Sequence, residues 1–224
     1  MLAFLFPGQG SQRVGMGKAL MEASAECRTT FEEADSILGV SLSRLCIDGP
    51  EDQLTLTENA QPAILTTSIA AYRFVLAQGL QPDFVAGHSL GEYSAHVAAG
   101  TLSFADAIMT VRERGRFMQE AVPVGVGSMA AILGLDAEVV MQVCKDVANG
   151  AVVAPANLNA PGQVVIAGER EAVGRATTEA RERGAKRVIP LPVSAPFHCA
   201  LMQPAADRLV PILQRVNVAN PRIP

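Results

Sequence analysis

The chain has 224 residues, of which 49% are hydrophobic and 18% are charged, and its formal net charge at pH 7 is −4. This length and composition suit one large domain, or one domain that carries a smaller one, and they exclude an intrinsically disordered protein. A negative chain without a basic cluster also excludes a nucleic-acid-binding protein, because that function needs lysine and arginine to displace counterions.

The first residues and the cysteines bear on where the protein works. The sequence begins MLAFLFP, which contains no basic segment and is too short an apolar run for a signal peptide or a membrane span. The four cysteines form no C-x-x-C pair and are expected to be free thiols, as in a reducing compartment. We therefore expect a cytoplasmic protein that does not act on a membrane.

Apolar runs of strand length alternate with longer helical patterns, and this alternation predicts an α/β fold. In chain order, we expect a strand at 2–6, helices around 16–26, 30–38 and 59–78, a strand at 82–86, and helices at 92–100 and 103–121. Helical spacing predicts that the third helix turns inward Ile64, Leu65, Ile69, Tyr72, Val75 and Leu76. The same spacing predicts that the helix at 103–121 has an apolar face formed by Phe104, Ile108, Val111 and Met118.

From about residue 125 the rhythm of the sequence changes. We expect a strand at 128–133, a helix at 136–147, strands at 152–156 and 163–167, a helix at 169–183, a strand at 186–190 and a final helix at 201–213. The order β-α-β-β-α-β is the signature of a ferredoxin-like subdomain. The prediction is an α/β-hydrolase-like body at 1–124 and 194–224 with an inserted ferredoxin-like subdomain at 125–193. The chain stops where another strand is expected, so we expect the body to lack its C-terminal part.

Residues 87–91 (GHSLG) match the G-x-S-x-G motif of a nucleophile elbow. A strand is expected before the motif and an Ala-rich helix closed by Gly100 after it, which is the context that the motif requires. The sharp turn strains the serine backbone and exposes the hydroxyl, while the helix N-terminus directs N–H groups and a positive dipole at the reacting centre. Ser89 is therefore the predicted nucleophile.

A serine nucleophile needs a base within hydrogen-bond reach, and the chain has three histidines. His88 adjoins Ser89 and should point away from it, and His96 lies about two turns along the predicted helix, facing the core or solvent. His198 lies in a loop, where catalytic bases are common, and is the predicted base. Asp207 is expected to face solvent, so a different group, or one beyond the end of the chain, should orient the imidazole.

Acyl transfer also requires donors for the oxyanion that develops during the reaction. The main-chain N–H of Leu90 is one natural donor, and Gln9 or Gly10, in the loop after the first strand, is the candidate for the second. Alternatively, the glycines of that loop merely permit a tight turn. No H-E-x-x-H motif and no clustered His or Cys spacing occurs, so no metal site is expected.

Arg112, Arg114 and Arg116 alternate along the helix predicted at 103–121, so they cannot share one face. A buried arginine needs an anionic partner, and a carboxylate that it binds through two hydrogen bonds fits it well. From the pattern alone, three solvated charges are favoured over a carboxylate-binding site.

Five blocks of the sequence resemble the malonyl-CoA:acyl carrier protein transacylase family of bacterial fatty-acid synthesis, and they occur in the family's order. The blocks are residues 6–12 (FPGQGSQ), 87–92 (GHSLGE), 114–119 (RGRFMQ), 154–159 (APANLN) and 192–198 (PVSAPFH). The resemblance covers essentially the whole chain. By this resemblance Ser89 would be the nucleophile and His198 the general base and acid, and Gln9 and the Leu90 amide would flank the oxyanion.

The resemblance also implies how the acyl group is bound. Arg114 would hold the free carboxylate of the malonyl group, which reverses the preference for a solvated charge at this position. Phe197 resembles the malonyl-selective form of the family, in which its bulk leaves little space for a branching methyl group. Gln61 and Asn157 occupy motif positions near the family's cleft.

The family's activity implies ping-pong transfer of a malonyl group from coenzyme A to the phosphopantetheine thiol of acyl carrier protein, through a malonyl-serine ester. The coenzyme A thioester is the substrate, and no cofactor is needed. Acyl carrier protein is acidic, and Lys186 and Arg187 are candidates to contact it, although two exposed charges at a strand edge are an equally good interpretation. We expect a monomer whose partners are malonyl-CoA and acyl carrier protein.

Two other functions remain open. A serine thioesterase or hydrolase would use the same elbow, but it has no use for a buried cation beside the acyl pocket. A truncated, weakly active or non-catalytic acyl- or CoA-binding form is the second, because members of the family continue past residue 224 with the group that orients the histidine. We expect the chain to hold the primary catalytic residues with an incompletely supported His198.

Overall fold

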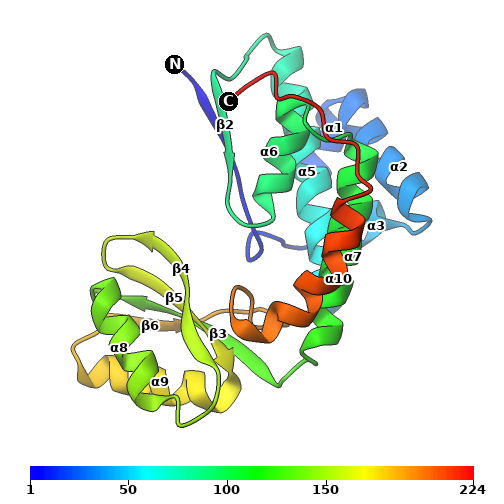
Figure 1. Ribbon diagram of the computed structural model, residues 1–224. Coiled ribbons are helices and arrows are strands. Elements are labelled where there is room, and N and C mark those ends of the chain that lie inside the picture. Colours follow the sequence, from blue (N-terminus) through cyan, green and yellow to red (C-terminus); the bar gives the residue numbers. More distant parts are fainter. The chain divides into compact units, whose positions relative to one another are not determined.

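The computed structural model describes residues 1–224 and shows a mixed α/β protein. The chain forms two compact units (Figure 1): the larger consists of Met1–Arg116 and Leu209–Pro224, and the smaller of Phe117–Arg208. The subdomain expected at 125–193 lies inside the smaller unit, which also includes flanking residues on both sides.

The larger unit contains a two-stranded parallel sheet made of β1 (Ala3–Phe6) and β2 (Phe84–Gly87). Parallel pairing needs a long crossover, which here consists of helices α1 (Lys18–Ala23), α2 (Ala25–Leu38), α3 (Leu42–Asp48), α4 (Glu51–Thr55) and α5 (Thr57–Ala77). Phe6 pairs with Gly87, the last residue of each strand. The loops after β1 and β2 therefore leave the sheet at the same edge.

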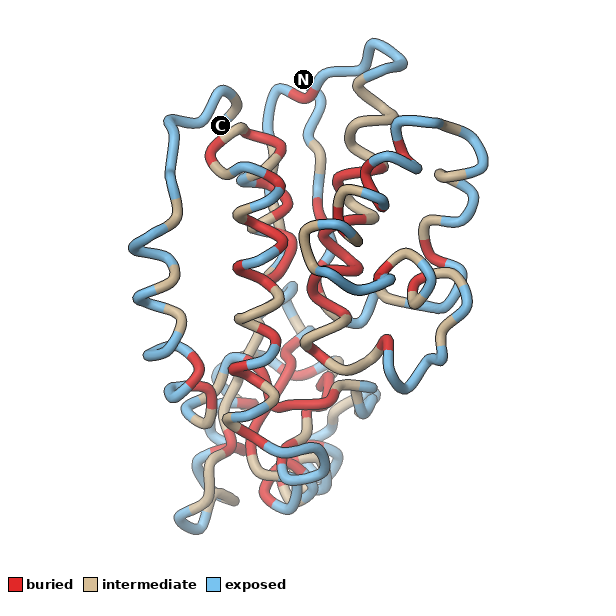
Figure 2. The backbone as a smooth tube through the Cα atoms, turned by 90° about the vertical axis from the view of Figure 1, so that its right-hand side faces the viewer, coloured by how far each residue is buried: buried red, intermediate tan, exposed pale blue.

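The helices of the larger unit enclose an apolar core, and Figure 2 shows buried residues (red) along their inward faces. The face predicted for α5 is buried at Ile64, Leu65 and Ile69. Toward the end of this helix it is only half-buried, at Tyr72, Val75 and Leu76. The face predicted for α7 (Phe104–Ala121) is buried at Phe104, Ile108, Val111 and Met118. Helix α6 (Gly91–Ala99) ends, as predicted, at Gly100, whose φ is 76°.

The structure corrects the helix pattern near the N-terminus. The sequence predicts helices at 16–26 and 30–38, but α1 and α2 are separated at Ser24. The extended backbone of Ser24 interrupts the helix, and its side-chain oxygen caps α2 by accepting the Cys27 N–H at 3.4 Å. Helices α3 and α4 have no predicted counterpart, because each is too short to show a helical period.

The smaller unit is built on a four-stranded antiparallel sheet with the strand order β4-β5-β3-β6. Its strands are β3 (Gly127–Leu133), β4 (Val153–Ala160), β5 (Gln163–Glu169) and β6 (Arg187–Pro190). Its helices α8 (Ala137–Val147) and α9 (Arg170–Glu182) bury their apolar residues with the sheet in a second core. The predicted β-α-β-β-α-β order is present in the chain.

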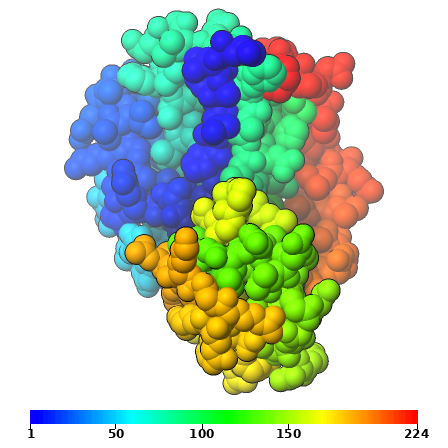
Figure 3. Space-filling model, turned by 90° about the vertical axis from the view of Figure 1, so that its left-hand side faces the viewer, coloured from blue at the N-terminus to red at the C-terminus, as the bar shows by residue number.

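After β6 the chain forms a short 3-10 turn (Ala200–Met202) and helix α10 (Gln203–Leu213), close to the helix predicted at 201–213. The last residue reaches β2, where the Pro224 carbonyl oxygen accepts the Val85 N–H at 2.9 Å. The first residues (dark blue in Figure 3) lie on the surface of the larger unit, and Leu5 there is 76% exposed. No helix combines the length and the apolar character needed to cross a membrane.

Most of the thiols of the molecule are buried. Cys27, Cys46 and Cys144 are buried free thiols, and Cys199 is a partly exposed one. Burial raises the pKa of Cys46 to about 12 and that of Cys144 to about 11, so both stay protonated and unreactive at neutral pH. No group of three or more His, Cys, Asp or Glu side chains is arranged to hold a metal ion.

Candidate active site

The sharp turn between β2 and α6 carries Ser89. Its φ is 53°, in the left-handed region that residues with a side chain rarely adopt. Strand β2 ends at Gly87 and α6 begins at Gly91, so the strand, turn and helix of a nucleophile elbow are all present. Leu90 is the N-cap of α6, where the helix dipole is positive, and the N–H groups of Gly91 and Glu92 donate to the His88 and Ser89 carbonyl oxygens at 3.0 and 3.1 Å. The turn that carries Ser89 therefore lies at the positive end of the α6 dipole.

The end of β1 packs directly against this turn. The His88 N–H donates to the Phe6 carbonyl oxygen at 3.0 Å. A Cβ atom at Gly91 would lie 2.1 Å from the same oxygen, so only glycine fits there. The loop that follows Phe6 and holds Gln9 therefore starts beside the turn that holds Ser89.

Three residues predicted for the acyl site, Gln9, Gln61 and Arg114, are joined by hydrogen bonds through Thr57. Arg114 Nη1 donates to Gln61 Oε1 at 2.6 Å, and Gln61 Nε2 donates to Thr57 Oγ1 at 2.9 Å. The Thr57 hydroxyl in turn donates to Gln9 Oε1 at 2.9 Å. Thr57 and Gln61 are both 0% exposed, so water does not compete for these bonds. Thr57 was not among the predicted site residues, because threonine is common at the start of a helix and its presence there does not indicate a functional role.

Arg114 reaches this chain of bonds because two helices approach closely. Helix α7 passes so near α5 that a Cβ atom at Gly115 would lie 2.5 Å from the Thr57 carbonyl oxygen. The Arg114 Cζ atom also lies 5.7 Å from the centroid of the Tyr93 ring, within the range of a cation–π interaction. Tyr93 belongs to α6, the helix that follows the Ser89 turn, so the guanidinium lies on the side of the unit that carries the elbow.

The three arginines of α7 differ in their surroundings. Arg116 is exposed and pairs with Glu113 at 2.5 Å, and Arg112 donates to the Glu58 carbonyl oxygen at 2.9 Å. Arg114 is partly buried and forms no ion pair with a carboxylate. Burial lowers the pKa of Arg114, and the neighbouring Tyr93 and Glu92 oppose that shift. The interpretation as solvated charges thus fits Arg116 and fails for Arg114, whose charge is suited to bind an anion.

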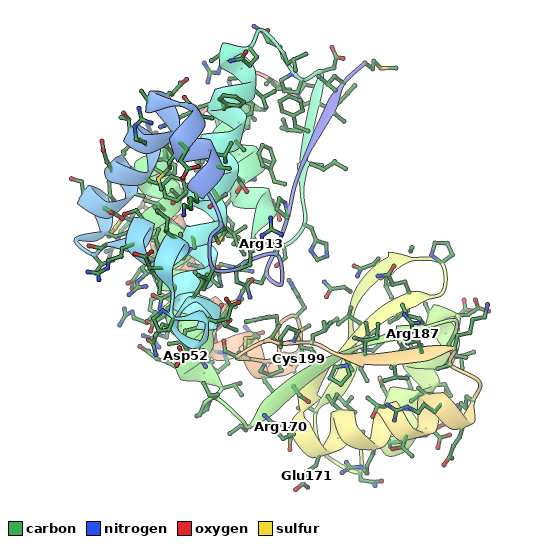
Figure 4. The ribbon with its side chains drawn as sticks, turned by 180° about the vertical axis from the view of Figure 1, so that it is seen from behind. Arg13, Asp52, Arg170, Glu171, Arg187 and Cys199 are labelled. Atoms are coloured by element: carbon green, nitrogen blue, oxygen red, sulfur yellow. The ribbon has the colours of Figure 1, made fainter.

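In the smaller unit, the predicted base His198 follows a buried segment. Residues 194–197 are buried, whereas His198 itself is exposed. Gln119 Nε2 donates to the Ser194 carbonyl oxygen at 3.3 Å, and the thiol of Cys199 (Figure 4) donates to the Pro196 carbonyl oxygen at 3.2 Å. The histidine therefore projects from a loop whose neighbouring residues are fixed on both sides.

His198 shares a backbone property with Ser89. Its φ is 59°, and only Ser89, Asn149 and His198 combine a positive φ with a side chain. Strained backbone of this kind is concentrated at functional sites. Two of the three strained positions therefore coincide with the predicted nucleophile and the predicted base.

The remaining predicted residues also belong to the smaller unit. Phe197 is buried, with 6% of its surface exposed. Asn157 is partly buried on β4, next to a shift in the pairing register with β5, and such irregularities re-aim side chains. Lys186 and Arg187 are exposed at the beginning of the edge strand β6, where Figure 4 labels Arg187.

Three other titratable residues considered from the sequence, two histidines and one aspartate, are exposed on the surface. His96 is exposed on α6, 4.0 Å from Glu92. Asp207 is exposed and accepts a hydrogen bond from Gln203 at 2.7 Å, as expected for a residue that faces solvent. His88 is exposed as well, although its main chain belongs to the elbow.

Comparison with known proteins finds relatives along the whole chain. A family model described as the acyl transferase domain matches residues 3–224. The malonyl CoA-acyl carrier protein transacylase of Bacillus subtilis (strain 168) is 55% identical over 224 residues, which are 100% of this chain and 71% of that protein. The protein of the same name from Escherichia coli (strain K12) is 52% identical over 223 residues, which are 99% of this chain and 72% of that protein.

Solved structures show the same similarity. The malonyl CoA-acyl carrier protein transacylase from Coxiella burnetii matches with a TM-score of 0.97 and 47% identity, over 100% of this chain and 71% of that one. A type II PKS acyl-carrier protein in complex with its malonyl-transacylase matches with a TM-score of 0.96 and 50% identity, over 100% of this chain and 72% of that one.

Proposed function

The chain belongs to the acyl transferase domain family and, within it, to the malonyl-CoA:acyl carrier protein transacylases, and on this premise we propose how its residues move a malonyl group from coenzyme A to acyl carrier protein. The observation that carries the proposal is a partly buried arginine without a carboxylate partner in the unit that holds a nucleophile elbow. The elbow provides acyl transfer, and the cation selects an acyl group that carries its own negative charge.

In the first half-reaction the Ser89 hydroxyl attacks the thioester carbonyl carbon of malonyl-CoA, and His198 accepts the hydroxyl proton. The carbonyl oxygen becomes an oxyanion, which Gln9 and the Leu90 N–H stabilise at the positive end of α6. When the C–S bond breaks, the thiolate of coenzyme A takes the proton from His198. The products are coenzyme A and a malonyl ester of Ser89.

In the second half-reaction His198 removes the proton from the phosphopantetheine thiol of acyl carrier protein. The thiolate attacks the ester carbonyl carbon, the same donors stabilise the oxyanion, and the C–O bond to Ser89 breaks. His198 then returns the proton to the serine oxygen. Because water competes with the thiol for the ester, the site must keep water poorly placed while the ester waits.

Selection of the acyl group falls to side chains around the ester. The Arg114 guanidinium binds the free malonyl carboxylate through two hydrogen bonds, and Gln61 holds that guanidinium at 2.6 Å. Phe197 limits the space next to the α-carbon, and Asn157 contributes a polar side chain to the acyl cleft. No cofactor is required, because the thioester of the substrate supplies the activated carbonyl.

The partner that receives the malonyl group is acyl carrier protein. The proposal is supported by the similar malonyl-transacylase that was solved in complex with an acyl-carrier protein. Because acyl carrier protein is acidic, the exposed Lys186 and Arg187 of the smaller unit are the proposed contact. We propose that the protein works as a monomer.

We also assign the two units to finer fold classes. The larger unit is proposed to be α/β-hydrolase-like, supported by the parallel β1–β2 pair and the elbow between β2 and α6. The smaller unit is proposed to be ferredoxin-like, supported by its β-α-β-β-α-β order and by its antiparallel sheet with β3 and β5 in the middle.

The function is tested by capture of the covalent intermediate. After incubation with malonyl-CoA, mass spectrometry should find a malonyl ester on Ser89, which moves to holo acyl carrier protein when that protein is added. The Ser89→Ala variant should show no adduct. Arg114→Ala should lose the malonyl adduct but still form an acetyl adduct from acetyl-CoA. Release of free malonate at the same rate with and without acyl carrier protein would instead identify a thioesterase.

A further inference from the structure

The hydrogen bonds in the chain Arg114–Gln61–Thr57–Gln9 all run in one direction, and the Arg114 cation fixes the first two. A guanidinium can only donate, so Gln61 must turn its oxygen toward Arg114 and its nitrogen toward Thr57. The Thr57 hydroxyl accepts from that nitrogen and directs its own proton to Gln9 Oε1. Gln9 is therefore held through its oxygen, and the two N–H groups of its Nε2 atom are left to donate in other directions.

We propose that Thr57 is a positioning residue that couples the carboxylate site at Arg114 to the oxyanion donor at Gln9. This inference rests on the proposed function, since it assigns Thr57 a role at the same acyl site. All donors in the chain point away from the cation, so each bond polarises the next one in the same sense. Thr57 and Gln61 are fully buried, and in such surroundings water does not weaken this effect.

The main chain of Thr57 reinforces the coupling. Its carbonyl oxygen lies at the contact of α5 with Gly115, the residue after Arg114, while its hydroxyl holds Gln9, 48 positions away in the sequence. One residue thus contacts both the helix that carries the carboxylate site and the loop that carries the oxyanion donor. A carboxylate that draws Arg114 into place also fixes the end of the chain at Gln9.

Comparison of two substrates, acetyl-CoA and malonyl-CoA, distinguishes this positioning role of Thr57 from a simple contribution to malonyl binding. An acetyl group has no carboxylate and does not use Arg114, but its transfer passes through the same oxyanion. Loss of the Thr57 hydroxyl should therefore lower the maximal rate of Ser89 acylation by both acetyl-CoA and malonyl-CoA. The KM should rise for malonyl-CoA alone, because only that substrate depends on a well-placed Arg114.

The test uses three variants with matched shapes. Thr57→Val removes the hydroxyl at nearly constant volume, and Thr57→Ser keeps it. Thr66→Val is the control, because Thr66 lies on the same helix, is 0% exposed, and has a side-chain oxygen without a hydrogen-bond partner. Single-turnover acylation of Ser89 should be about 10-fold slower or more in Thr57→Val with both substrates. Thr57→Ser should restore the rate, and Thr66→Val should match the parent chain.

Several outcomes would overturn the coupling. They are parental rates for Thr57→Val with both substrates, a loss confined to malonyl-CoA, and equal losses in Thr57→Val and Thr57→Ser. If urea unfolding shows that Thr57→Val is not folded, Gln61→Met breaks the same chain and must reproduce the slower acetyl transfer; a parental acetyl rate there overturns the proposal. Failure of the parent chain to form any acyl-Ser89 would refute the proposed function itself, which separates the two conclusions.

Discussion

The two loops that carry the strained residues Ser89 and His198 are held in different ways. At the Ser89 turn, main chain packs on main chain, and a Cβ atom at Gly91 would lie 2.1 Å from the Phe6 oxygen. The His198 loop instead follows a buried run at 194–197 and is held by side-chain bonds of 3.3 and 3.2 Å. The difference teaches that backbone sterics fix the turn of the proposed nucleophile Ser89, whereas side-chain contacts hold the segment before the proposed base His198. Substitution of the packed glycine at the first loop should therefore mainly cost stability, and substitution of His198 at the second should mainly cost rate.

The largest effect is expected at the base itself. His198→Ala should slow acylation of Ser89 by about 10²- to 10⁴-fold, the usual contribution of a general base, while leaving the unfolding transition unchanged because His198 is exposed. Stopped-flow measurement of coenzyme A release gives the rate. His96→Ala, at an exposed position of α6, is the control and should keep the parental rate. A rate loss below about threefold for His198→Ala would contradict its role as the base.

Stability should fall most at the elbow. Gly91→Ala places a methyl group against the Phe6 oxygen and should lower the free energy of unfolding by about 1–3 kcal/mol. Gly174→Ala is the matched control, because Gly174 lies inside α9 and its added Cβ would have no atom within 4 Å beyond its chain neighbours and the nearby backbone of its own helix. That change should raise stability by about 0.5–1 kcal/mol. Urea unfolding measures both, and equal effects at the two glycines would refute a steric requirement at the elbow.

A smaller effect is expected at the segment before His198. Gln119 donates to the Ser194 and Val122 carbonyl oxygens through long bonds of 3.3 and 3.4 Å, and its own side-chain oxygen is buried without a partner. Gln119→Leu removes these weak bonds together with the unpaired oxygen, so the free energy of unfolding should fall by about 1 kcal/mol or less. A loss above about 3 kcal/mol in urea unfolding would show that Gln119, rather than packing, fixes the segment.

The smallest effect concerns the ring beside Arg114. Burial raises the pKa of Tyr93, and Arg114 partly offsets this shift. Because the folded protein holds the phenol proton to higher pH than the unfolded chain, the associated stability is present below about pH 10 and is lost as the pH rises further. The chain has two tyrosines and no tryptophan, so Tyr72→Phe isolates Tyr93 in a spectrophotometric titration. Adding Arg114→Gln should move its midpoint upward, and a downward move would contradict the contact.

Local patterns in the sequence were enough to locate the Ser89 turn, because a nucleophile elbow is specified by adjacent residues. The apolar faces of α5 and α7 followed from helical spacing in the same way. The burial of Arg114 could not be predicted in this way. It depends on α5 passing next to Gly115, and the residue pattern of α7 alone does not indicate that contact. The hydrogen bond from Thr57 to Gln9 joins residues 48 positions apart, so local sequence patterns could not predict it either. Sequence resemblance identified Arg114, but only the packed structure shows which side chain connects it to Gln9.

The glycine at position 115 has a consequence for the choice of acyl group. Any larger residue there would push α7 away from the start of α5 and carry the neighbouring guanidinium out of reach of Gln61. In the proposed function, preference for a charged over a neutral acyl chain therefore depends partly on the spacing of two helices. An enzyme with relaxed specificity for the acyl group can therefore arise from a change at a position that does not contact the substrate. Every proposed acyl-binding side chain would be left intact.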